Sequence, residues 1–104
     1  MTAVVVVATI RPAPGHHAAV TTALEATIAR VHAEDSGCLL YALHEGDGEL
    51  VMIERWASAD ALAEHSRGKA LVELNEALDG LVEGSPDVRI LQPHPAGTPA
   101  QGTL

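Results

Sequence analysis

The chain is poor in aromatic residues. Its 104 residues include one Trp, one Tyr and no Phe. Hydrophobic residues still make up 47% of the sequence, so we expect one domain with a core of Val, Leu, Ile and Ala. Trp56 is the one large flat side chain available to that core or to a ligand.

Basic residues and cysteine are also scarce. There are 6 Lys and Arg against 14 Asp and Glu, which gives a formal net charge of −8. Such a surface repels phosphate groups, so we expect no nucleic acid and no membrane partner. Cys38 is alone and cannot form an internal disulfide. The apolar run of residues 3–10 is too short to cross a bilayer and has no basic residues before it, so we expect a soluble, cytoplasmic protein.

The first half of the chain reads as a strand followed by a helix. Residues 4–10 are Val-rich and almost all apolar, which is typical of a strand. A helix over residues 14–34 is predicted by apolar residues at helical spacing: Val20, Leu24, Ile28 and Val31. Gly37 suits a left-handed position that ends this helix.

A predicted hairpin comes next. Residues 38–45 and 49–57 are strand-like runs, and the Gly-Asp-Gly segment between them favours a tight turn. Ser58 has the side chain of an N-cap, so a short helix is expected over residues 59–66.

The last part of the chain completes a repeated unit. Leucines keep helical spacing within residues 71–84, and residues 88–91 form a final short strand. The predicted fold is α+β and ferredoxin-like, βαββαβ, with a four-stranded antiparallel sheet and both helices on one face. We expect a domain over residues 1–92 and a tail over 93–104 that is flexible or contacts a partner.

The predicted strands do not alternate between apolar and polar residues. Residues 4–7 are all Val, on both faces of the first strand. In the second strand, strict alternation places Leu39 and Tyr41 on one face and Cys38 and Leu40 on the other. A sheet with one face bare would expose a large apolar patch. We therefore expect a homodimer in which two sheets close a barrel; a sheet covered by loops is the alternative.

His65 and Trp56 are candidates for chemistry. His65 shares the sheet-facing side of its helix with Leu62, where it could act as a base or bind a backbone carbonyl at the rim. Trp56 could stack on an aromatic ligand or simply fill the core.

Glu54 lies on the same strand face as Met52 and Trp56. A carboxylate on an apolar face must be paired, protonated or functional. An ion pair with Arg11 or Arg89 is the structural alternative to a catalytic role.

Tyr41 and His44 lie near the end of the second strand and could bind a ligand oxygen or be plain surface residues. The histidines show no metal-ligand spacing, so no metal site is expected.

Several segments of the chain together resemble the antibiotic biosynthesis monooxygenase domain family. The resemblance covers about residues 4–93, and the Glu-Arg-Trp block is its most specific part. It rests on the following residues: Val4 to Ile10 with Arg11-Pro12 and Gly15, Ser36-Gly37-Cys38 with Tyr41, Ile53-Glu54-Arg55-Trp56-Ala57-Ser58, Ala61-Leu62 and His65.

The resemblance implies a dimeric α+β barrel that oxidises a quinol or a phenolic, polyketide-type molecule with dioxygen and without a cofactor. By the same resemblance, the catalytic residues are His65 at the pocket rim or as base, Trp56 as pocket wall and Glu54 as a residue that orders the site. The candidate substrate contacts are Tyr41, Met52, His44 and Thr9. Relatives that degrade haem have an Asn on the first strand and a His on the last helix. Here Ala8 and Thr9 replace the Asn and residues 69–82 hold no His.

Two other functions stay open on this scaffold. The dimer could bind a small apolar molecule without converting it, or His65 could shuttle a proton in an isomerase or lyase. Oxygen consumption with an oxidisable phenol separates the first of these from an oxidase, and turnover without air identifies the second.

Overall fold

The computed structural model describes residues 2–104 and follows the predicted order of elements. The four strands form one antiparallel sheet in the order β2-β3-β1-β4. Their bounds are β1 Val4–Ile10, β2 Cys38–Gly46, β3 Glu49–Trp56 and β4 Asp87–Leu91. The helices are α1 His17–Glu34, α2 Ala59–Ser66, α3 Lys69–Leu78 and α4 Pro99–Gly102. The α+β, ferredoxin-like fold is therefore confirmed.

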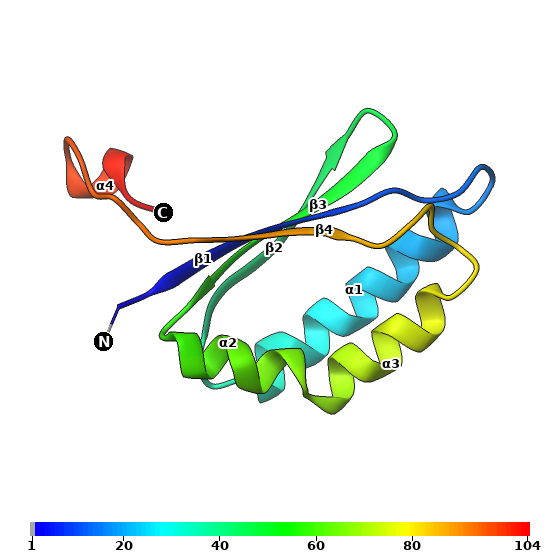
Figure 1. Ribbon diagram of the computed structural model, residues 1–104, viewed down its shortest axis with the longest axis horizontal. Coiled ribbons are helices and arrows are strands. Elements are labelled where there is room, and N and C mark those ends of the chain that lie inside the picture. Colours follow the sequence, from blue (N-terminus) through cyan, green and yellow to red (C-terminus); the bar gives the residue numbers. More distant parts are fainter. Residues whose placement is uncertain (1) are drawn as a thin grey trace.

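Helices α1, α2 and α3 cover one face of the sheet, and the core lies between the two layers (Figure 1). Alternate residues of β1 and β3 point into this core and are buried, as the period of two in a strand requires. One part of the core surrounds Trp56, and the other surrounds Leu24 on α1. Within residues 2–104, no helix is long and apolar enough to cross a membrane.

The other face of the sheet carries no helix (Figure 1). A β-bulge in β2 sets which residues reach it: Cys38 pairs with Trp56, whereas Leu40 pairs with Arg55. The strict alternation expected for β2 is therefore wrong at its start. The bulge turns Cys38 toward the core, where it packs beside the buried residues, and leaves Leu39 51% exposed.

Helix α3 is shorter than its leucine spacing predicts. It ends at Leu78, and Gly80 follows with a positive φ of 78°. The next residues turn back, and Val82 forms a bridge with Pro12. The tail contains the short helix α4, which the sequence pattern does not indicate, and it runs beyond the end of the sheet (Figure 1). The division into residues 1–92 and a partner-contacting tail stays a prediction.

The turn from α1 to β2 is packed directly against α2. A Cβ placed on Gly37 would lie 2.5 Å from the Cβ of Ala61, and the Gly37 carbonyl accepts a hydrogen bond from the Ala57 N–H at 2.9 Å. The predicted left-handed conformation of Gly37 is wrong, because its φ is not positive. Glycine is needed here because any side chain would collide with the helix. Ser58 caps α2 as expected, accepting from the Ala61 N–H at 3.1 Å.

This contact gives a test by double-mutant cycle. Gly37→Ala should lower the free energy of unfolding by about 1–3 kcal/mol, since overpacking forces the turn and the helix apart. Adding Ala61→Gly should recover part of this loss, although glycine within a helix itself costs about 1 kcal/mol. Urea unfolding of both single variants and the double variant measures the coupling. Simply additive effects would contradict the contact.

Candidate functional site

A cavity of about 250 Å³ lies between the sheet and the helices. Its volume is just below the roughly 300–1,000 Å³ that small-molecule sites occupy. The lining residues that are buried include Val6, Tyr41, Met52, Glu54 and His65. The lining residues that are exposed mark the mouth, between the α2–α3 layer and β4: Ser66, Asn75, Pro86 and Val88.

Glu54 is the buried carboxyl group of this cavity. It is 5% exposed, and its Oε1 accepts a hydrogen bond from the Trp56 indole Nε1 at 2.9 Å. Burial raises the pKa of Glu54 to about 7, because loss of solvation disfavours the carboxylate more than the indole hydrogen bond favours it. Near neutral pH this group can therefore hold or release a proton inside an apolar cavity.

The predicted ion pair of Glu54 with an arginine is wrong. Arg11 lies past the end of β1 and pairs with Glu49 at 3.8 Å. Arg89 pairs with Val7 across the strands, on the sheet face turned away from Glu54, and its nearest carboxylate is Asp87 at 4.0 Å. The buried carboxyl group of Glu54 is thus stabilised by the indole hydrogen bond and by its raised pKa, which favours the neutral form, rather than by a positive charge.

His65 lies on the sheet-facing side of α2, as predicted, and is 6% exposed. Its ring stacks on Trp56 with centroids 4.4 Å apart and an interplanar angle of 30°. The Tyr41 ring packs edge-on against the His65 ring, with centroids 5.3 Å apart. The hydrogen-bond partner of Nδ1 is the Asp35 carboxylate at 3.0 Å and not the backbone carbonyl considered as an alternative.

Tyr41 completes the polar part of the cavity. It lies directly opposite Glu54 in the β2–β3 register, so both side chains point toward the helices. Burial, together with the nearby Glu54, raises the pKa of the Tyr41 hydroxyl, which keeps it protonated as a hydrogen-bond donor. A donor, a carboxyl group and an imidazole thus meet in one largely apolar space.

The structure separates the seven candidate residues into three groups. Four of them line the cavity: Tyr41, Met52, Glu54 and His65. Trp56 is fully buried behind them and contacts Glu54 and His65 instead of forming the cavity wall. His44 and Thr9 lie on the opposite sheet face, level with Val51, so they do not reach this cavity.

Sequence reasoning missed the partner of His65 and the mouth of the cavity. Asp35 reads as part of a helix-ending segment, and only the packing of the α1–β2 turn against α2 brings it to His65. Asn75 and Ser66 sit at exposed helix positions, whose nearness to β4 depends on how the layers pack.

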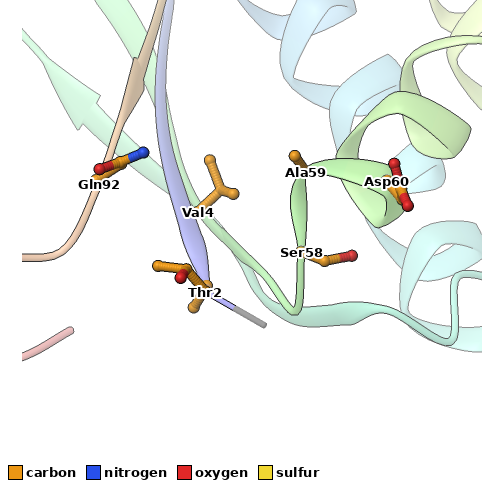
Figure 2. A pocket seen from close by; sticks show the side chains of 7 residues that line it. Thr2, Val4, Ser58, Ala59, Asp60 and Gln92 are labelled. Atoms are coloured by element: carbon orange, nitrogen blue, oxygen red, sulfur yellow. The ribbon is translucent and has the colours of Figure 1, made fainter.

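A second hollow, of about 260 Å³, lies where β1 begins, beside the start of α2 (Figure 2). Asp60 and Gln92 are exposed at its edge, and the Ser58 hydroxyl is engaged in capping α2. Among the described residues that line it, no buried polar side chain is free to bind a ligand. Among residues 2–104, no cluster of three or more His, Cys, Asp or Glu is placed to hold a metal ion.

Known proteins of similar sequence point to one family. The sequence model described as antibiotic biosynthesis monooxygenase matches residues 3–77. A protein of Mycobacterium tuberculosis, "Putative monooxygenase Rv0793", is 44% identical over 64 residues, which are 60% of this chain and 62% of that protein. The sequence match thus spans about three fifths of that relative.

Solved structures agree with the sequence matches. The structure of Rv0793 superposes with a TM-score of 0.85 and 29% identity, covering 93% of this chain and all (100%) of that one. A Caulobacter crescentus structure, described as a putative antibiotic biosynthesis monooxygenase, superposes with a TM-score of 0.83 and 28% identity. The superposition covers 88% of this chain and 89% of the Caulobacter crescentus chain.

The raised pKa of Glu54 predicts a specific pH dependence of stability. The unfolded carboxyl group ionises near its ordinary value of 4.5, whereas the folded one does so near 7. The stabilisation that comes from Glu54 is therefore complete below pH 4.5. As the pH rises from about 4.5 to 7, the free energy of unfolding falls by up to about 3 kcal/mol. Urea unfolding at pH 5 and pH 8 should show this loss in the wild type and not in Glu54→Gln.

The matched control is Glu25→Gln, which changes an exposed glutamate on α1. It should keep the pH dependence of the wild type. If Glu54→Gln kept it as well, Glu54 would not hold a proton in the folded protein near neutral pH.

Proposed function

Because the chain belongs to the antibiotic biosynthesis monooxygenase family, we propose that it is a monooxygenase that oxidises a quinol or another electron-rich phenol with dioxygen. The observation that supports this most is the convergence of His65, Glu54 and Tyr41 on one apolar cavity between sheet and helices. A dry space with a few converging polar groups suits binding and deprotonation of a small aromatic molecule.

In the proposed reaction the substrate supplies the electrons. His65 takes the phenolic proton, and the phenolate passes one electron to dioxygen. The substrate radical and superoxide combine at a ring carbon, and the imidazolium returns its proton to give a hydroperoxide. The O–O bond then breaks as that carbon loses its hydrogen to a base, and protonated Glu54 provides the proton for the leaving hydroxide. One oxygen atom ends in a quinone and the other in water, so this route needs no metal or flavin.

The other members of the site support this chemistry. Tyr41 is a protonated donor that can bind a substrate oxygen, and Met52 offers an apolar wall. Trp56 holds Glu54 and His65 in place through one hydrogen bond and one stacked contact. We therefore assign Trp56 to the positioning of the catalytic groups.

The same proposal includes a homodimer that covers the bare sheet face. That face carries a set of apolar side chains: Leu40, Ala42, Val51, Ile53, Val5, Val7 and Leu91. In their midst the Arg55 Nε is buried and has no hydrogen-bond partner among residues 2–104. A second sheet would dry the apolar residues and could supply an acceptor for this donor.

Substitution of His65 tests the chemistry. His65→Gln should lower the rate of oxygen consumption with 1,4-dihydroxynaphthalene by about 100-fold or more, the usual contribution of a general base. Oxygen-electrode traces are corrected for autoxidation without protein. His16→Gln, whose side chain makes no capping hydrogen bond, should leave the rate unchanged. An unchanged rate in His65→Gln would remove His65 from the mechanism, and turnover of substrate without air would favour an isomerase.

Light scattering tests the dimer independently of turnover. At micromolar concentration the wild type should have twice the mass of one chain. Val51→Asp on the bare sheet face should give a single-chain particle, because a carboxylate there would lose its water in the interface. Val72→Asp, at a 48% exposed position on α3, should stay dimeric. A wild type of single-chain mass would contradict the proposal.

A further inference from the structure

His65 separates the cavity from a small pocket on the outside of the molecule. Its side chain is only 5% exposed, yet it lines both the cavity and an outer pocket of about 80 Å³. Asp35 lines the outer pocket and not the cavity. The imidazole ring is therefore in contact with a charged group on its outer side and with the ligand space on its inner side.

The two ring nitrogens of His65 have different surroundings. Nδ1 lies 3.0 Å from the Asp35 Oδ2, on the outer side. No side chain or backbone group among residues 2–104 forms a hydrogen bond with Nε2. An ionised carboxylate can only accept, so the nitrogen that faces Asp35 must carry the hydrogen. Nε2 is then left with a lone pair.

The backbone holds Asp35 firmly in this place. It follows Glu34, the last residue of α1, and its N–H donates to the Val31 carbonyl at 3.0 Å. Its own carbonyl accepts from the Cys38 N–H at 3.0 Å. The close contact of Gly37 with Ala61 then fixes this turn against α2, one helical turn before His65.

We infer that Asp35 is a positioning residue, which forms with His65 a carboxylate–imidazole dyad that presents an unprotonated Nε2 to the cavity. This role rests on the proposed function, because Nε2 is the atom that would take the substrate's phenolic proton. When that proton arrives, Nδ1 keeps its own hydrogen and the carboxylate stabilises the resulting imidazolium. No proton has to pass to Asp35.

The dyad makes a prediction about the resting protein that needs no substrate. In the neutral state, ¹⁵N chemical shifts of the His65 ring should show a protonated Nδ1 and an unprotonated Nε2. Asp35→Asn should weaken this preference or reverse it, because an amide can donate to Nδ1 as well as accept from it. Asp79→Asn is the matched control, since Asp79 is exposed and likewise follows the last residue of its helix, α3.

The kinetic test uses the same variants with 1,4-dihydroxynaphthalene and dioxygen. Asp35→Asn should lower kcat by roughly 10- to 100-fold, the factor that one hydrogen bond to a charged group contributes. KM should change little, because Asp35 lies outside the cavity. Asp79→Asn should behave as the wild type in both measurements.

The possible outcomes separate the dyad from the proposed reaction. A wild-type His65 with its hydrogen on Nε2 overturns the dyad whatever the activity. A changed tautomer in Asp35→Asn with an unchanged kcat overturns the positioning role. If the wild type consumes no oxygen but shows the Nδ1 hydrogen and its loss in Asp35→Asn, the proposed oxidation fails and the dyad stands.

Discussion

The sheet has a single layer of helices, and that layer does not extend over β4. The strands β2, β3 and β1 are packed under α1, α2 and α3, whereas Val88 and Ile90 of β4 remain 55% and 63% exposed on the side that faces the helices. This incomplete cover leaves the space between the layers open at one edge and gives the cavity its mouth. Because all of α1, α2 and α3 lie on one side, the other sheet face carries no helix. Both the site and the expected subunit contact therefore follow from how far the helices reach.

The polar groups of the cavity depend on one another. A carboxyl group buried among apolar residues would be unfavourable as a lone anion, and Glu54 avoids this through the indole hydrogen bond and a pKa near neutrality. Trp56 in turn stacks on His65, whose orientation is set from outside the cavity by Asp35. The groups that constrain one another thus come from three places in the chain: Glu54 and Trp56 from β3, His65 from α2, and Asp35 from the end of α1. Such an arrangement keeps the imidazole of His65 and the carboxyl group of Glu54 in fixed places.

The sequence was sufficient for the architecture and for the centre of the site, because both depend on local periodicity. Strand alternation predicts that Glu54 and Trp56 share a face, and helical spacing turns His65 toward the sheet. The errors arise where distant segments meet. The bulge at Leu39 shifts the start of β2, and the need for glycine at position 37 comes from α2 and not from the turn itself. Asp35 could not be paired with His65 in advance, since 30 residues separate them and only tertiary packing joins them.

The lone tryptophan has a practical consequence. Trp56 is the only indole of the chain, it is fully shielded from solvent, and it touches Glu54 and His65, two of the titratable groups of the cavity. Its intrinsic fluorescence therefore comes from the candidate site alone. Changes in emission on adding a compound or changing the acidity of the buffer report on this one location, without any label.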